Sequence, residues 1–440
     1  MKVLQVNTQD QKGGTANVAY GLYKGLKNKG HSSWMAVGLQ QRDDQDIFKI
    51  ENNRFVPSWR KAVTKILNKL DTKPYFKGRD RIKSFFRTVS NPGLFITGTK
   101  IIESFYYPGT RHILEFMPDK PDLINFHNLH GNYFDLRILP YYSKKLPCVL
   151  TLHDMWLFTG YCKQSFGCDR WLNSCIECPI INQNLVKKSG PELGIKKKRK
   201  IYKKSKFHIV TPSKWLMNMV EESILAEGIK GASVIPNGID LSIFTPGDKK
   251  LAKEKIGLET TNEKIFLVIT HGNFFRNIES HERFFGFLQD KSINFKLIWI
   301  SGEIIPDRLR QYKYSYIPFI SEKKVIVNYY QAADFMLHFS RGDTFPLVVE
   351  ESMACATPVV ASKTGGIPEQ IRDGEDGLLF SAGEESIVAE RVLGFLESES
   401  SYKKLSAAAL KKAKSEFDFK DQLNNYLELY KKIVDEHEYI

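Results

Sequence analysis

Two acidic residues, Asp343 and Glu351, stand eight positions apart in a segment that predicts a loop leading into a helix. Unpaired backbone N–H groups at the start of a helix bind phosphate well. Asp343 would precede those amides, and Glu351, about two turns into the helix, would face the same cleft. Such a set suits a sugar diphosphate: an acid for sugar hydroxyls, amides for phosphate and an acid for ribose hydroxyls. The alternative is that Asp343 only caps the helix and Glu351 is a surface acid.

Four cysteines form a second cluster that could do chemistry. They lie within seventeen residues and end in a Cys-x2-Cys pair. This count and closing spacing are typical of a tetrahedral structural zinc site in a reducing compartment. The same thiols would suit a packed, reduced loop, or a disulfide formed in vitro. The members of the cluster are Cys162, Cys168, Cys175 and Cys178.

Alternating strand and helix patterns determine where these residues would lie. The first forty residues read as strand, glycine-rich turn, helix and strand, which is the βαβ opening of a parallel sheet. The alternation starts afresh near Lys264, after a linker at Pro246-Gly247. We therefore predict an α/β protein with two doubly wound Rossmann-like domains, over residues 1–245 and 246–420. Their ligands would bind at the carboxyl ends of strands, in the cleft between the domains.

The composition is that of a soluble globular protein, with 42% hydrophobic and 26% charged residues. The apolar runs are strand-sized, and Lys2 is followed directly by a strand-like run. We therefore expect neither a membrane span nor a signal peptide, and we predict a cytoplasmic location. The formal charge of +14 favours an anionic partner. Nucleic acid is not expected, because no helix-turn-helix or aromatic-basic pattern is present.

Residues 51–118 interrupt the alternation and predict a basic insertion. Residues 60–87 carry ten Lys or Arg against two Asp, and two apolar stripes recur there at helical spacing. Such helices can dock on the inner face of an anionic membrane, or they can pack onto the first domain's sheet, which is the more common fate. The stripes are Val63, Ile66, Leu67 and Leu70, followed by Ile82, Phe85, Phe86 and Val89.

The segment from residue 340 to 362 resembles the carboxylate–seven-residue–carboxylate motif of the family 4 retaining glycosyltransferases, which have the two-domain GT-B fold. Glu351 matches the second glutamate of that motif, which the resemblance implies at the donor ribose. Asp343 stands where the family usually has glutamate, at the hydroxyls of the donor sugar. The resemblance covers nearly the whole chain. It extends the expected donor-binding set to Thr344, Phe345, Pro346 and Leu347.

Three further positions carry the resemblance. The turn with Gly14 and Thr15 resembles the family's amino-terminal glycine loop, where the backbone approaches the donor phosphates and the acceptor. His153 resembles the histidine that reaches the transferred sugar from a strand end, although a lone histidine is more often a satisfied core or surface group. The family places an arginine and a lysine after the first strand of the second domain. Here Arg276 is the one candidate for this charge clamp, and Arg341 is a candidate to compensate for the missing cation.

The cysteine cluster and the His-Asp-Met-Trp-x-Phe-Thr-Gly run before it are similar to a subgroup that builds exopolysaccharide, including colanic-acid-type enzymes. The run over residues 125–131 matches that subgroup as well. It implies that His127 and His130 lie on the acceptor side. A helix over residues 421–440 resembles the one that crosses back from the second domain to the first.

The resemblance implies a retaining glycosyltransferase that moves a sugar from a UDP- or GDP-linked donor onto a glycan or a polyprenyl-diphosphate-linked acceptor in surface polysaccharide synthesis. His153, Asp343 and Arg276 are its expected catalytic residues. No catalytic metal is expected, so structural zinc would be the one metal. The competing hypotheses are a phosphorylase or epimerase on the same fold, and a catalytically weak or inactive nucleotide-sugar-binding protein. The protein would be cytoplasmic and peripheral on the inner membrane face.

Overall fold

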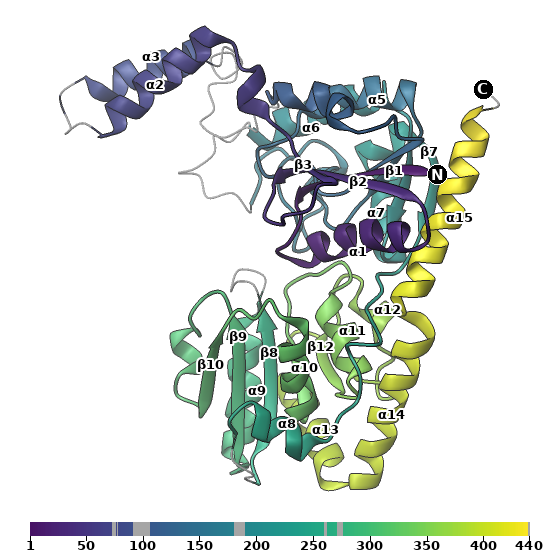
Figure 1. Cartoon of the computed structure of the whole chain (residues 1–440). Coiled ribbons are helices and arrows are strands. Elements are labelled where there is room, and N and C mark those ends of the chain that lie inside the picture. The colour runs from purple at the N-terminus through teal and green to yellow at the C-terminus, as the bar shows by residue number, and fades with distance from the viewer. Residues whose placement is uncertain are drawn as a thin grey trace.

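The computed structural model describes residues 1–72, 76, 78–90, 106–179, 190–258, 262–270 and 276–438. These residues form two α/β domains, one above the other in Figure 1, and a long helix that runs along one side of both. Each domain is built on one parallel sheet with a hydrophobic cluster on each face. This is the doubly wound arrangement that the alternating sequence patterns predict.

The first sheet has the strand order β3-β2-β1-β4-β5-β6-β7, and every neighbouring pair is parallel. The order changes direction between β1 and β4, and such a switch point opens a crevice at the carboxyl ends of the strands. The strands are β1 (Lys2–Gln9), β2 (Ser32–Leu39), β3 (Ile47–Lys49), β4 (Leu123–Phe126), β5 (Cys148–Thr151), β6 (Phe207–Thr211) and β7 (Ile229–Val234).

The second sheet has the strand order β10-β9-β8-β11-β12-β13 and is also parallel. Its direction changes between β8 and β11. β8 reads as one apolar run because both of its faces are covered. The strands are β8 (Lys264–Thr270), β9 (Phe295–Ser301), β10 (Tyr314–Pro318), β11 (Phe335–His338), β12 (Val359–Ser362) and β13 (Leu378–Phe380).

Helices connect most of the strands. α1 begins directly after Gly13, whose φ of 92° favours glycine, and the start of this helix lies at the first switch point. The helices that cover the sheets are α1 (Gly14–Asn28), α5 (Leu139–Lys145), α6 (Gly190–Tyr202), α7 (Lys214–Glu222), α8 (Lys249–Lys255), α9 (Ile278–Asp290), α10 (Lys323–Ala332), α11 (Leu347–Ala354), α12 (Ile367–Gln370), α13 (Glu385–Glu397) and α14 (Glu399–Glu416). Short 3-10 helices are η1 (Asn52–Phe55), η2 (Pro108–Phe116), η3 (Leu136–Ile138), η4 (Arg170–Leu172), η5 (Ile224–Gly228) and η6 (Asp307–Leu309).

The last helix, α15 (Phe419–Glu438), leaves the second domain and packs on the first (Figure 1). Its apolar face belongs to the same buried cluster as Val3, Leu22 and Val149 of the first domain. The Tyr430 hydroxyl of this helix accepts a hydrogen bond from Asn125 Nδ2 at 2.7 Å. The helix thus completes one face of the first domain's core.

The predicted insertion contains a helical hairpin, α2 (Ser58–Thr72) and α3 (Arg79–Ser90), that projects away from the first domain (Figure 1). It does not pack onto the sheet, since Trp59 is 51% and Phe85 64% exposed. The side chain of Val89 lies outside the described residues. None of the described helices is long and apolar enough to cross a bilayer. Farther along the same insertion, η2 contributes Ile113 to the first domain's core.

Candidate active site

A pocket of about 240 Å³ lies between the two domains, at the carboxyl ends of strands beside both switch points. All of the predicted catalytic residues line it, and so do all of the predicted donor-binding residues except Glu351. These lining residues are Gly14, Thr15, His153, Arg276, Asp343, Thr344, Phe345, Pro346 and Leu347.

Arg276 is a basic side chain in the wall of this pocket. Its Nη2 donates to the carbonyl of Ile269 at 2.9 Å, and its Nη1 donates to Nδ1 of His338 at 3.0 Å. The buried Nε–H of Arg276 has no partner among the described residues. Burial lowers the pKa of Arg276 to about 10, and nearby Asp343 opposes this shift, so the guanidinium stays charged at neutral pH. A buried cation with a donor to spare is suited to bind an anion.

His338, the last residue of β11, joins Arg276 to Asp343. A guanidinium can only donate, so Nδ1 of His338 accepts and the ring proton lies on Nε2. Nε2 is 3.3 Å from Oδ2 of Asp343, to which it donates. Burial, and then the charge of Arg276, lowers the pKa of His338 to about 4 and keeps the ring neutral. The three side chains therefore hold one another in a fixed arrangement.

The loop that carries Asp343 is fixed by two glycines. A Cβ at Gly365, where φ is +60°, would lie 1.8 Å from the Asp343 carbonyl oxygen, and Gly366 N donates to that oxygen at 3.0 Å. Oδ1 of Asp343 accepts from Thr344 N at 2.9 Å. The N-cap of α11 is Pro346, so Asp343 does not cap this helix.

The first turn of α11 supplies unpaired backbone donors to the pocket. Leu347 and Val348 are the first two residues of the helix, and both line the pocket. Their N–H groups have no acceptor within the helix, because the first amides of any α-helix lack one. Together with the positive end of the helix dipole, they offer an anion site beside Arg276.

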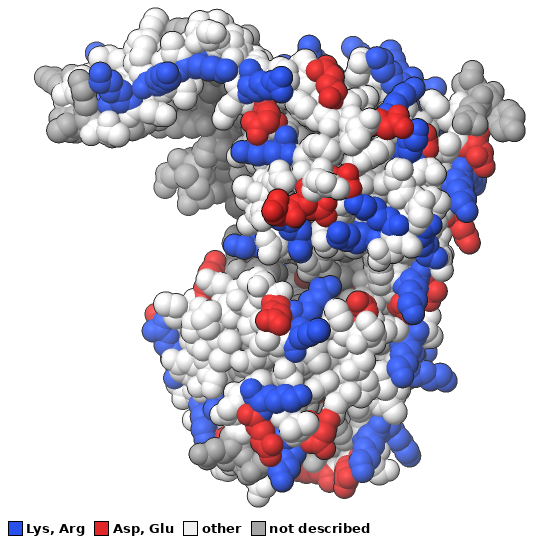
Figure 2. Space-filling model, viewed as in Figure 1, with Lys and Arg blue, Asp and Glu red and all other residues white. Residues whose placement is uncertain are grey.

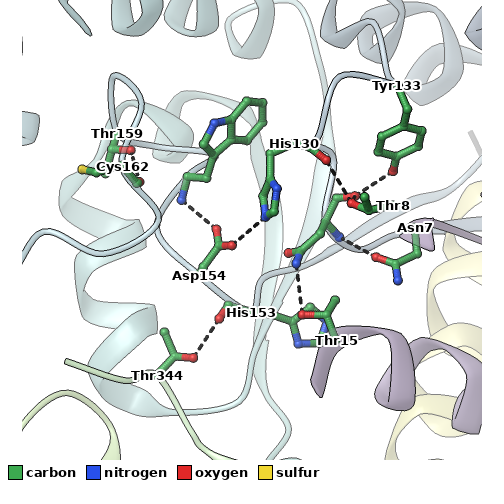
Figure 3. A network of polar contacts seen from close by, with 12 residues as sticks. Asn7, Thr8, Thr15, His130, Tyr133, His153, Asp154, Thr159, Cys162 and Thr344 are labelled. Atoms are coloured by element: carbon green, nitrogen blue, oxygen red, sulfur yellow. Dashed lines mark hydrogen bonds and ion pairs between the residues drawn. The ribbon is translucent and has the colours of Figure 1, made fainter. Parts of the chain in front are cut away.

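Direct hydrogen bonds join the two walls of the pocket. The Thr344 hydroxyl donates to the carbonyl of His153 at 2.8 Å, as Figure 3 shows. Asn237 Nδ2 donates to the carbonyl of Phe345 at 3.2 Å. Farther out, the carboxylate of Glu369 accepts from the first amides of α7, Lys214 N at 2.9 Å and Trp215 N at 2.7 Å. The domains are thus tied together at and around the pocket.

A buried chain of polar groups stands behind His153. Its Nε2 lies 3.0 Å from Nδ1 of His127, whose Nε2 lies 2.8 Å from Oε1 of Gln5. Nε2 of His127 also lies 3.3 Å from Nδ2 of Asn125, which only donates, but the shorter contact with the amide oxygen of Gln5 places the proton on Nε2, so that Nδ1 accepts from His153. Burial lowers the pKa of His153 to about 4 and that of His127 well below its ordinary value. His153 is therefore neutral, and its Nδ1 is left to accept a hydrogen bond.

His130 supports the pocket from the neighbouring loop. Its Nε2 lies 2.9 Å from Oδ2 of Asp154, and its carbonyl accepts from the Thr8 hydroxyl at 2.9 Å (Figure 3). The Thr15 hydroxyl, in turn, accepts from Asn128 Nδ2 at 3.0 Å. Neither His127 nor His130 lines the pocket itself. Their assignment to an acceptor site stays a prediction.

Glu351 lies one helical turn beyond the pocket lining on α11, and not in the shared cleft that the sequence suggested. The Tyr330 hydroxyl donates to its Oε2 at 2.7 Å. Burial raises the pKa of Glu351 to about 7, while Tyr330 and Lys323 oppose this shift. Glu351 is therefore a carboxylic acid that titrates near neutral pH.

The four clustered cysteines lie in the loop after β5 and around η4, with Cys175 buried. Burial raises the pKa of the Cys162 thiol to about 11, and the neighbouring Cys175 and Cys178 add to the shift, so these thiols are close together. Among the described residues, no group of three or more His, Cys, Asp or Glu is arranged to hold a metal ion. Zinc binding by the cluster stays a prediction.

Elemental analysis tests that prediction. Protein purified without added metal is expected to contain near-stoichiometric zinc, which a Cys175→Ser/Cys178→Ser variant should lose because two of four ligands are gone. The matched control replaces Cys148 and Cys355, the two cysteines outside the cluster, and should keep the metal. Metal-free wild-type protein with four titratable thiols in the cluster and full stability would rule the site out.

Two residues of the pocket were not singled out as functional from the sequence. His338 is the last residue of β11, and its place shortly before Asp343, at the end of an apolar run, was a usable signal. Asn237 stands in an Asn-Gly pair, which is typical of a turn, and no local pattern indicated that its amide reaches the pocket wall.

Comparisons with known proteins concern the sequence and the fold. Residues 308–412, which include α11, match the family described as glycosyl transferases group 1. The N-acetyl-alpha-D-glucosaminyl L-malate synthase of Bacillus anthracis is 24% identical over 220 residues, covering 49% of this chain and 57% of that protein. The D-inositol 3-phosphate glycosyltransferase of Mycolicibacterium gilvum is 30% identical over 165 residues, covering 34% of this chain and 36% of that protein. The chain thus spans from about a third to just over half of the length of these relatives.

The whole chain also matches a solved structure, Anabaena HepE in complex with UDP-glucose. The TM-score is 0.61 at 15% identity, over 98% of this chain and 100% of that one, so the likeness concerns the fold. The names of the two curated relatives refer to malate and inositol phosphate and do not support the exopolysaccharide subgroup. The chain therefore has the two-domain GT-B fold, and residues 308–412 of its second domain match the glycosyl transferases group 1 family.

Proposed function

We propose that this protein is a retaining glycosyltransferase that transfers a sugar from a UDP- or GDP-linked donor to a glycan or polyprenyl-diphosphate-linked acceptor in surface polysaccharide synthesis. The observation that carries the proposal is the convergence in one interdomain pocket of the Arg276 guanidinium, the first amides of α11 and the Asp343 carboxylate. The first two suit a diphosphate and the third suits sugar hydroxyls.

The chemistry would run as a front-face displacement. The bond between the anomeric carbon and the leaving phosphate oxygen breaks as the acceptor oxygen bonds to the same face, and the leaving phosphate takes the acceptor proton. Arg276 and the amides of Leu347 and Val348 would stabilise the charge that builds on the diphosphate. Asp343 and His153 would accept hydrogen bonds from the sugar. The walls that meet at Thr344 would exclude water, which favours transfer over hydrolysis.

A second candidate is a GT-B-fold protein that binds a nucleotide sugar without turning it over. It is favoured by the aspartate at position 343 and by Arg276 being the only cation among the described residues that line the pocket. Titration of UDP, GDP and ADP, followed by a turnover assay with a polyprenyl-diphosphate glycan, separates the two. Binding with donor turnover supports the enzyme, binding without turnover supports the second candidate, and no binding contradicts both.

Glu351 would bind the donor ribose one turn beyond the diphosphate. Because its pKa is raised to about 7, the carboxylate that accepts ribose hydroxyls forms only as the pH rises through that value. Nucleotide affinity should therefore increase between about pH 6 and 8 in the wild type and stay flat in Glu351→Gln. Calorimetric titration with UDP and with GDP measures the affinity of the wild type and of Glu351→Gln across this pH range. Glu397→Gln, at an exposed position, is the control. Equal pH profiles in wild type and Glu351→Gln would contradict the role.

The α2–α3 hairpin would dock the enzyme on an anionic membrane, where a lipid-linked acceptor lies. Figure 2 shows a row of basic side chains along the hairpin. The same two helices carry the exposed apolar side chains of Trp59 and Phe85. Such a combination binds anionic lipid surfaces. Liposome co-sedimentation should show binding that needs anionic lipid, weakens with salt and drops in a Lys61→Glu/Lys65→Glu/Lys69→Glu variant. The same reversal at Lys404, Lys411 and Lys414 of α14 is the control. Equal binding to neutral vesicles would contradict the proposal.

A further inference from the structure

A second pocket, of about 440 Å³, lies in the first domain at the end of the sheet opposite the candidate active site. It opens at the amino ends of β5, β6 and β7, whose carboxyl ends point toward the other domain, and the last turns of α15 form one wall. None of its lining residues lines the interdomain pocket. Its size lies within the range of small-molecule sites and exceeds that needed for one inorganic anion.

Positive charge dominates this pocket. Five lysines from four separate segments line it, against one carboxylate, Glu436. Two nearby lysines are ion-paired: Lys196 of α6 lies 2.6 Å from Glu192, and Lys203, just after that helix, lies 3.9 Å from Glu227. Within the described part of the chain, no carboxylate lies in ion-pair distance of the five. They are Lys144, Lys204, Lys206, Lys230 and Lys432.

Helix stabilisation alone does not account for so many lysines. α5, α6 and α15 all end near this pocket, and cations at helix carboxyl ends are favourable. Each helix end is equivalent to roughly half a negative charge, which a single lysine more than balances. Three helix ends and Glu436 together leave roughly two and a half of the five positive charges uncompensated. That surplus matches a phosphate ester or a diphosphate.

The floor of the pocket is fixed. His208 follows an irregularity in the pairing of β6 with β7, and its ring packs on Gly231, where a Cβ would lie 2.6 Å from Nδ1. Its Nε2 lies 2.9 Å from the Ser233 hydroxyl. Burial lowers the pKa of His208, and the charges of Lys432 and Lys230 lower it further, against Glu436. The imidazole is therefore neutral at neutral pH and adds no charge to that of the lysines.

We propose that this pocket binds a phosphorylated ligand carrying at least two negative charges. Lysine ammonium groups bind phosphate as point charges, and five of them on different elements can surround such a group from several sides. The same chemistry is offered by a soluble phosphate monoester and by the monoester headgroup of phosphatidic acid. The site is separate from the donor pocket and does not depend on the proposed transfer reaction.

Amine-reactive footprinting read by mass spectrometry tests the site on the full chain, because it reports each lysine separately from the interdomain pocket. Inorganic pyrophosphate, at ionic strength matched with chloride, should lower the labelling of Lys206, Lys230 and Lys432 severalfold and leave Lys404, Lys411 and Lys414 unchanged. In a Lys206→Glu/Lys230→Glu variant, pyrophosphate should no longer protect Lys432 from labelling, because two of the binding lysines are gone. Unchanged labelling of the pocket lysines, or equal protection of the α14 lysines, would overturn the proposal.

A second arm distinguishes the two sources of phosphate. Vesicles that contain phosphatidic acid, and vesicles of phosphatidylcholine alone, replace pyrophosphate, with the hairpin variant Lys61→Glu/Lys65→Glu/Lys69→Glu used beside the wild type. Protection by phosphatidic acid that persists in the hairpin variant assigns a lipid headgroup to the pocket. Protection by pyrophosphate alone assigns a soluble ligand, and protection by neither overturns the site.

Discussion

Arg276→Ala is expected to reduce kcat/KM for the donor by about 30-fold or more, which is a loss of at least ~2 kcal/mol of transition-state stabilisation. The guanidinium is charged, buried and held by Ile269 and His338, so it meets a diphosphate without reorganising. Charge that develops on the leaving group in such a site is stabilised more strongly than in water. Initial rates measured at saturating and at limiting donor concentration give kcat and kcat/KM, and hence the loss.

Arg341→Ala is the matched control for this variant. Arg341 lies near Asp343 in sequence but is exposed, and its guanidinium stacks over the Phe166 ring at 5.2 Å. If Arg276 is the charge clamp, Arg341→Ala should keep near-normal turnover. Normal turnover in Arg276→Ala, or an equal loss in Arg341→Ala, would refute the assignment of the clamp to Arg276 alone.

His153→Ala is expected to lower turnover strongly while free nucleotide affinity stays near the wild-type value. The ring is neutral and presents Nδ1 as an acceptor, so its effect should fall on the transferred sugar and not on the nucleotide. Loss of one hydrogen bond made in the transition state costs kcat more than KM. His112, which is half-buried, far from the pocket in sequence, and pairs with Glu115, serves as the control position. Collapse of nucleotide binding in His153→Ala would show that this residue holds the fold or the nucleotide instead.

The same group predicts how the reaction responds to acid. The pKa of His153 is lowered to about 4 by burial, so the ring should remain neutral down to that value. A fall in kcat/KM for the donor between pH 8 and 6 is therefore expected from Glu351, whose pKa is about 7, and should be absent in Glu351→Gln.

The parallel sheets and the core of the candidate site were predictable from sequence because both rest on local patterns. Strand ends can be read from apolar runs, and the ends of parallel strands meet at one edge, which brought His153, Asp343 and Arg276 together. Contacts that depend on register were not predictable. Glu351 was expected about two turns into its helix and facing the cleft, but α11 begins at Leu347, so this acid lies about one turn along the helix, beyond the residues that line the pocket and against Tyr330.

The role of His338 illustrates the same limit of local patterns. Its position in a strand was readable from the sequence. Its contacts with Arg276 and Asp343 were not, because these residues are brought together only in the folded chain. The hairpin was readable as two amphipathic helices. Its projection from the domain was not, because helical periodicity alone does not reveal what a face contacts.

The helix α15 has a consequence for how the protein is made. Domains usually fold in order as they leave the ribosome, but the apolar face formed by Val3, Leu22 and Val149 is covered only when residues 419–438 arrive. At about 5–20 residues per second, synthesis of the intervening second domain takes roughly 10–40 s. During this interval the first domain carries an uncovered apolar strip, so the second domain, made later, can finish folding first.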